Sequence, residues 1–185
     1  MRCLAVVVCI AATSAQAGEA QEPVPPPAES TRSESTAVPA VPTPEQQRFL
    51  SGLRTTTRGV AQLKDGLGRV SRAQATRDSV ARRRAGRFLA GLCGSARGFL
   101  ARGRPQMNPT AYEDSTRLLA RRLTIRIDSL IAYTPTCERD AVALPDATAP
   151  ELTKRMKAYD TAFRDFRAAI GLPVREDTSK TGNRR

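Results

Sequence analysis

Cysteines are the residues of this chain whose chemistry is easiest to place. The chain of 185 residues has four of them: Cys3 and Cys9 in the apolar stretch at its start, and Cys93 and Cys137 in its body. If the start is removed on export, the remaining two can form one disulfide bond in an oxidising compartment. Two free thiols, or a bridge between two copies of the chain, are the alternatives. We expect the Cys93–Cys137 disulfide.

Histidine is absent from the chain, and its absence excludes several kinds of site. Without it there is no Ser-His-Asp or Cys-His catalysis, and no histidine-ligated zinc or haem. None of the lysines lies at the S-x-x-K spacing, and no Gly-rich phosphate-binding loop is present. We therefore expect a non-enzymatic protein with no catalytic residues, no metal site and no cofactor; an enzyme of unfamiliar type is a minor alternative.

Residues 1–17 have the features of a cleavable secretory signal peptide. An apolar run over 3–12 is followed by Ala15 and Ala17, at the A-x-A spacing that signal peptidase recognises. The run is too short to span a bilayer, which takes about 20 residues. A lipoprotein signal ending at Cys9 is the alternative, although Val8 is larger than the residue expected before a lipidated cysteine. The very short basic start also leaves open a true start upstream. We expect a periplasmic or secreted protein.

The remainder divides into three parts. Residues 18–44 are rich in Pro, Glu, Ser and Thr, a composition that predicts a disordered linker. Residues 173–185 form a polar tail that is also expected to be disordered. Residues 45–172 carry the periodic apolar pattern of one helical domain, and no stretch of the mature chain approaches transmembrane length.

Apolar residues recur at spacings of three and four along residues 45–172, and this pattern predicts α-helices. The stripes are Leu53, Thr56, Val60, Leu63, Leu67 and Val70; Val80, Phe88, Leu89, Leu92, Ala96, Phe99 and Leu100; Tyr112, Leu119, Leu123, Ile127, Leu130 and Ile131; and Leu152, Met156, Tyr159, Phe163, Phe166 and Ile170. The first two stripes fit either two helices or one long helix kinked near 66–76. We predict an all-α bundle of three to four helices.

Capping residues, prolines and glycines predict where these helices begin and end. Leu118 and Ile125 broaden the third stripe, so the third helix is expected to be the most buried. The expected starts are Thr43 or Pro44, Ser71 or Thr76, Asn108-Pro109, and Pro150; the expected ends are Gly103-Arg104-Pro105, Pro135 and Gly171.

This assignment places Cys137 in a loop over 134–149, which creates a conflict. In a simple hairpin of the second and third helices, at about 1.5 Å per residue, the two cysteines lie more than about 20 Å apart. A disulfide requires Cα atoms within about 7 Å. Either the glycines at 86, 91, 94 and 98 break the second helix, or the loop folds back along the bundle. Those glycines otherwise predict close helix packing around Cys93.

Positive charge is concentrated in the first half of the helical domain. The whole chain carries a net charge of +12. Residues 48–104 contain thirteen arginines and Lys64 against two acids, Asp65 and Asp78, whereas residues 105–172 are nearly balanced. The densest cluster is Arg82, Arg83, Arg84 and Arg87.

Clustered arginines outside the cytoplasm favour an anionic partner, because guanidinium groups match phosphate and carboxylate oxygens. We expect this half to bind an anionic lipid, a polysaccharide or an acidic protein. The alternative is an ordinary solvated face in a chain whose preference for Arg over Lys reflects genome composition. Sequence-specific nucleic-acid binding is not expected, since no aromatic residues are interleaved with the arginines. A second hypothesis is a structural or adaptor module that docks a protein on an apolar helix face.

Overall fold

The computed structural model describes residues 41–173 and contains four α-helices in that range, with no strand there. They are α1 (Pro44–Gln74), α2 (Ser79–Gly103), α3 (Asp114–Ala143) and α4 (Pro145–Ala169), and two short 3-10 helices, η1 (Arg104–Gln106) and η2 (Pro109–Ala111), connect α2 to α3. The all-α prediction is confirmed in its four-helix form. The expected signal peptide, and nearly all of the expected linker and tail, lie outside the described residues.

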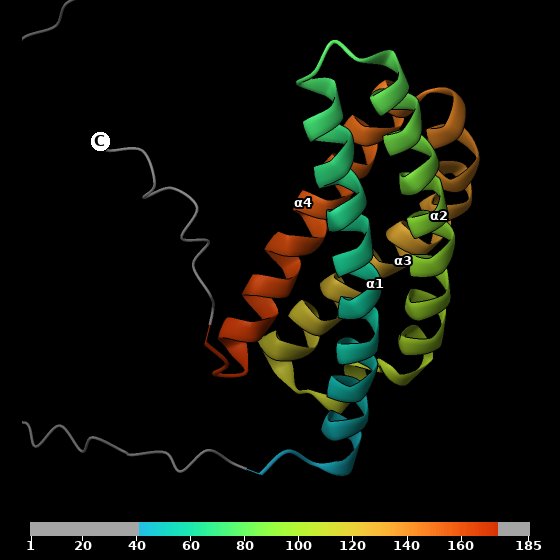
Figure 1. The fold of residues 1–185 in the computed structure, drawn as a ribbon. Helices are drawn as coiled ribbons and strands as arrows, with labels where there is room; N and C mark the ends of the chain where they lie inside the picture. The colour runs from blue at the N-terminus through green and yellow to red at the C-terminus, as the bar shows by residue number, and fades with distance from the viewer. Residues whose placement is uncertain (1–40, 174–185) are drawn as a thin grey trace, which may run out of the picture. The chain divides into compact units, whose positions relative to one another are not determined.

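The helices follow one another as antiparallel neighbours. Figure 1 shows α1 and α2 side by side, with α3 and α4 behind them and running obliquely to them. Each helix packs mainly against the next in the chain, whereas α1 and α4 share a smaller contact. They diverge toward the end where α1 begins and α4 ends. Within the described range, no helix combines the length and apolar character needed to cross a membrane.

The start of α1 agrees with the sequence. The Gln46 backbone N–H donates to the Thr43 hydroxyl at 3.3 Å, and the Thr43 backbone N–H donates to the Gln46 side-chain oxygen at 3.1 Å. Pro44 occupies the first helical position, where its missing N–H costs nothing. This capping box satisfies two backbone groups that would otherwise lack partners.

The boundary between α1 and α2 differs from the expected one. α1 continues through Gly66 and Gly68 to Gln74, and the cap of α2 is Asp78 rather than Ser71 or Thr76. The Asp78 carboxylate accepts a hydrogen bond from the Val80 N–H at 2.7 Å. Ser71 is therefore inside α1, and the turn between the helices spans 75–78.

Three glycines on α1, spaced by seven residues, allow α2 to approach closely. A Cβ atom added to Gly52 would lie 2.6 Å from the backbone oxygen of Gly103, and one on Gly59 would lie 2.9 Å from that of Ala96. The facing residues on α2 are also spaced by seven, so contact persists along the antiparallel pair. The facing pairs are Gly52 with Gly103, Gly59 with Ala96, and Gly66 with Leu89.

The glycines of α2 fall into two groups. Gly86 lies against the Ala141 backbone oxygen, and a Cβ on Gly94 would lie 2.8 Å from a carboxylate oxygen of Glu138. Gly91 has nothing within 4 Å, and Gly98 has only an arginine side chain nearby. The predicted close packing around Cys93 is therefore confirmed for Gly86 and Gly94 alone.

The predicted disulfide is present, but neither route expected for it is correct. Cys93 and Cys137 are bonded with their Cα atoms 6.0 Å apart, and both are fully buried. α2 is unbroken, and Cys137 lies within α3 rather than in a loop. Because α3 runs obliquely to α2, its later turns reach the middle of α2 (Figure 1).

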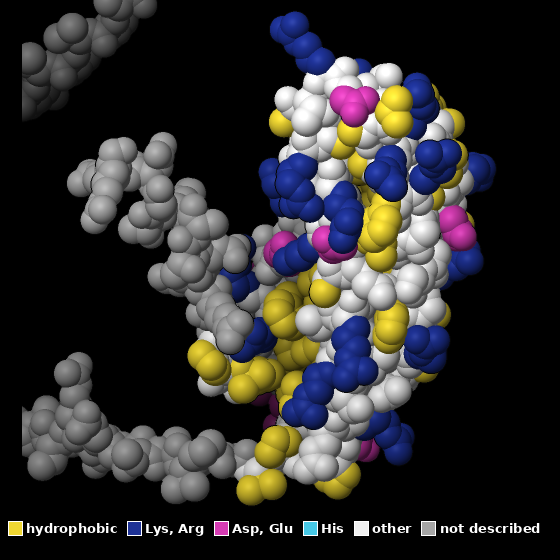
Figure 2. All heavy atoms as spheres, in the orientation of Figure 1, with side chains coloured by type: hydrophobic (Ala, Val, Ile, Leu, Met, Phe, Trp, Pro, Cys, Tyr) yellow, Lys and Arg dark blue, Asp and Glu magenta, His cyan; other side chains and the backbone are white. Residues whose placement is uncertain are grey.

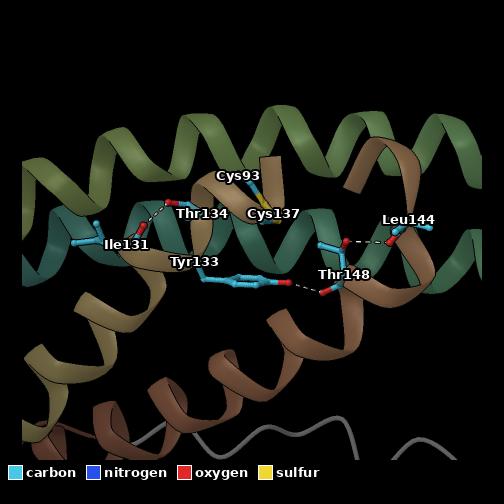
Figure 3. Close-up of a disulfide and its surroundings, with 7 residues drawn as sticks. All are labelled: Cys93, Ile131, Tyr133, Thr134, Cys137, Leu144 and Thr148. Atoms are coloured by element: carbon cyan, nitrogen blue, oxygen red, sulfur yellow. Dashed lines mark hydrogen bonds between the residues drawn. A yellow bond between two sulfur atoms is a disulfide. The ribbon is translucent and has the colours of Figure 1, made fainter. Parts of the chain in front are cut away.

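Pro135 does not end the third helix, contrary to expectation. A proline inside a helix leaves the carbonyl four residues earlier without its N–H partner. Here that carbonyl belongs to Ile131, and the Thr134 hydroxyl donates to it at 2.8 Å (Figure 3). This replacement bond lets α3 continue to Ala143, so the predicted loop over 134–149 is wrong and α4 already begins at Pro145.

The third helix also begins later than predicted. Asn108 caps η2 instead, and the backbone is extended at Tyr112 and Glu113 before α3 begins. The extended segment packs the Tyr112 ring against both Phe49 and Phe166, and each pair of ring centroids is 5.2 Å apart. Burial of this ring at the end of the bundle accounts for the delayed start.

Most of the predicted apolar stripes form the core, with exceptions on the outer surfaces. Leu118 and Ile125 are 67% and 52% exposed, so the expectation that they broaden the buried face of α3 is wrong. Val80 and Phe88 of α2 are also exposed, and the Arg69 guanidinium covers the Phe88 ring at 4.0 Å.

Substituting two glycines tests the α1–α2 contact. Gly52→Ala should lower the free energy of unfolding by about 1–3 kcal/mol, because the new methyl group meets the backbone of α2. Gly91→Ala should raise it by about 0.5–1 kcal/mol, because that position is open and alanine favours helix. Urea unfolding of the oxidised proteins measures both. Equal effects of the two substitutions would contradict the close approach.

Reduction tests the disulfide. Breaking the bond should lower the free energy of unfolding by about 2–4 kcal/mol, because the unfolded chain regains the freedom of a long loop. The measurement is urea unfolding with and without dithiothreitol. The Cys93→Ala/Cys137→Ala variant is the control and should not respond to the reductant. An unchanged midpoint for the reduced natural chain would show that the bond contributes nothing.

Candidate anion-binding surface

The arginines of α1 and α2 are mostly without an acidic partner. Of the thirteen arginines in residues 48–104, only Arg69, Arg97 and Arg104 form an ion pair within the described range. The other ten are exposed or, for Arg82, half-buried. Figure 2 shows basic side chains along the whole length of this face, over α1 and α2, with far fewer acidic ones. The positive charge is therefore spread along both helices.

The predicted cluster occupies the first turns of α2. Arg83, Arg84 and Arg87 are exposed and have no ion pair in the described range, whereas Arg82 is half-buried. Arg83 and Arg87 are one helical turn apart on the same side, and Arg84 points about 100° away around the helix. Three of the four predicted residues are thus placed to meet a ligand from solution.

Acids of the second half are used to hold the helices together. The Arg104 guanidinium of η1 donates two hydrogen bonds to the Asp128 carboxylate of α3, at 2.7 Å and 2.9 Å. Lys64 of α1 contacts Asp160 of α4 at 2.8 Å, and Arg97 contacts Glu138 at 3.3 Å. Because these carboxylates are engaged, they do not neutralise the ten arginines described above.

A groove between α1 and α4 combines apolar side chains with arginines. Its volume is about 480 Å³, within the range of small-molecule sites. The apolar lining comes from Leu50 and Leu53 of α1, Phe163 of α4, and Leu172 beyond α4. The arginines in its lining are Arg54, Arg58 and Arg167. Sequence reasoning missed this site because it counted Leu53 and Phe163 only as core residues. The signal available was Arg54 and Arg58, one turn apart beside Leu50.

Arg167 is the most constrained of the groove arginines. Its guanidinium carbon lies 5.5 Å from the centre of the Phe163 ring, and its Nε atom is buried without a hydrogen-bond partner. Phe163 in turn stacks on Tyr159 at 5.6 Å. Burial raises the pKa of Tyr159 to about 12, opposed in part by the nearby Thr57 side chain. Phe163, supported from below by the buried Tyr159 ring, therefore gives the groove an aromatic surface.

Two other hollows are present in the described range, and only the larger has acidic residues in its lining. The larger, of about 1050 Å³, lies at the end of the bundle and includes Glu45, Glu113 and Asp114 in its lining. Burial raises the pKa of Tyr112, which also lines it, to about 12. The other hollow, of about 560 Å³, lies between α1 and α4 beside Lys154 and Lys157.

The described residues offer no cluster of three or more acidic, cysteine or histidine side chains that could hold a metal ion. Comparison with protein-family models, with curated proteins and with solved structures finds no match for this chain. The function is therefore inferred from the charge and shape of the molecule itself.

Proposed function

We propose that this chain is an exported, non-enzymatic helical bundle that binds an anionic component of the cell envelope through the arginines of α1 and α2. The observation that carries the proposal is a set of ten arginines without acidic partners in the described range, nine on these two helices and Arg77 in the turn between them. Uncompensated charge of one sign disfavours a compact fold through self-repulsion, and an anionic ligand would relieve it.

Export and the disulfide support the same proposal. A buried disulfide between α2 and α3 suits an oxidising compartment, which is where the signal peptide would send the chain. Outside the cytoplasm, the anions that arginine forks recognise are lipid phosphates, acidic polysaccharides and carboxylates of acidic proteins. Exposed guanidinium groups spread along both helices favour an extended anionic surface over a small ion.

An adaptor role is the second candidate, and one observation favours it. Leu118 and Ile125 are exposed on α3 and lie seven residues apart, on the same side of the helix. A protein partner with an apolar face could cover them. Binding of that kind survives high salt, whereas binding through the arginines is weakened by it.

Charge removal on α2 tests the proposed function. The Arg83→Glu/Arg84→Glu/Arg87→Glu variant should bind phosphatidylglycerol vesicles about a hundredfold more weakly, since each basic residue near such a surface contributes about 1 kcal/mol. Vesicle co-sedimentation at low and high salt measures the affinity. Binding by the natural chain should fall as salt rises, and heparin is the matching polysaccharide probe.

The control is the Arg121→Glu/Arg126→Glu/Arg164→Glu variant, which changes the net charge equally on exposed residues of α3 and α4. It should keep most of the vesicle binding. Equal losses of vesicle affinity in the two variants would show that binding depends on net charge alone. Binding that is absent, or that does not depend on salt, would contradict the proposal.

A further inference from the structure

We infer that the groove between α1 and α4 binds one molecule of a single-chain anionic amphiphile, such as a long-chain fatty acid. The juxtaposition that leads to this assignment is an apolar groove whose lining contains three arginines and no acidic residue. The groove shares Arg54 and Arg58 with the α1 arginines of the proposed function but contains none of the α2 arginines, because its residues come from the first half of α1, the last turns of α4 and Leu172.

The apolar part of the groove would accept an acyl chain. Leu50 and Phe163 are only half-buried, and Leu172 is 41% exposed, so apolar surface is open to solvent there. Figure 2 shows hydrophobic side chains gathered in a hollow beside α1, toward the end where that helix begins. Covering such surface with methylene groups removes it from water, which favours binding roughly in proportion to the area covered.

The arginines would bind the head group. Arg54 and Arg58 are exposed and lie one turn apart on α1, while Arg167 lies across the groove on α4. None of the three has an ion pair within the described range, and Arg167 keeps a buried Nε–H without an acceptor. A carboxylate between them would accept charge-assisted hydrogen bonds from both helices. Such an acceptor would supply the partner that the Arg167 Nε–H lacks.

Charge also distinguishes among possible occupants. A second copy of this chain would bring a strongly basic surface toward three arginines, which disfavours dimers that close the groove. The segment 18–40 of this chain has four glutamates against one arginine and is the competing occupant of opposite charge. Its prolines and short side chains match an apolar groove less well than an acyl chain does. The fatty acid satisfies both the apolar lining and the arginines.

Calorimetry with myristate tests the inference. The full chain is expressed with its own residues 1–17 and oxidised. Myristate is then titrated into it, at concentrations below those at which myristate forms micelles. Myristate should bind at one site per chain, and myristyl alcohol, which has the same chain without the charge, should bind at least about tenfold more weakly. The Arg54→Gln/Arg58→Gln/Arg167→Gln variant should lose the preference for the acid.

Two further variants separate the groove from the α2 surface. Arg83→Gln/Arg84→Gln/Arg87→Gln should keep myristate affinity within about twofold while it weakens vesicle binding. The groove variant should lose myristate affinity and also weaken vesicle binding, because Arg54 and Arg58 belong to the α1 arginines of the proposed function. Thr57→Trp places a bulky side chain in the groove without changing any charge, so it should abolish myristate binding while vesicle binding stays unchanged. Circular dichroism checks that each variant is folded. If the triple groove variant unfolds, the result for Thr57→Trp alone tests whether myristate binds in the groove.

Several outcomes would overturn the inference. Equal affinity for myristate and its alcohol would show that the arginines do not bind the head group. Equal losses of myristate affinity in both arginine variants would indicate an unspecific attraction of the anion to positive charge. Myristate binding that requires removal of residues 18–40 would assign the groove to that segment. A dimer that blocks myristate, or full binding by Thr57→Trp, would also contradict it. Absence of vesicle binding by the natural chain, with myristate binding intact, would overturn the proposed function instead.

Discussion

The close approach of α1 and α2 is the constraint on which the rest of the structure depends. Gly52 and Gly59 bring the α1 backbone to within contact distance of the α2 backbone, at positions where an added Cβ would lie under 3 Å from a carbonyl oxygen. These glycines weaken α1 taken alone, and the cost is offset only when α1 packs against α2. The resulting hairpin gives α3 a surface to cross, and the Cys93–Cys137 bond fixes the crossing.

The same arrangement explains why the positive charge remains available. Acids of α3 and α4, such as Asp128 and Asp160, are engaged in contacts with Arg104 and Lys64 that join the two halves of the bundle. The outer faces of α1 and α2 then carry arginines most of which form no ion pair within the described range. α4 meets α1 over a short contact only, and the two helices diverge around the groove that contains Arg167 (Figures 1 and 2).

The spacing of apolar residues, the capping residues and the number of cysteines were enough to predict the helical class, the start of α1 and the disulfide pair. They failed where a tertiary contact overrode a local signal. Pro135 was expected to end a helix, but the Thr134 hydroxyl replaces the missing hydrogen bond. Asn108 was expected to begin one, but burial of the Tyr112 ring delays it. The groove could not be predicted either, because its residues come from helices far apart in the sequence whose oblique packing has no local signature.

The central claim is that the arginines without acidic partners bind an anion. Native mass spectrometry of the oxidised protein, purified from its own cells at low salt and without detergent, tests it most directly. The account predicts bound anionic molecules that leave when the salt concentration is raised, together with one fatty acid or similar amphiphile per chain that leaves only on denaturation. A protein that carries no bound molecule, or only neutral or cationic ones, would contradict it.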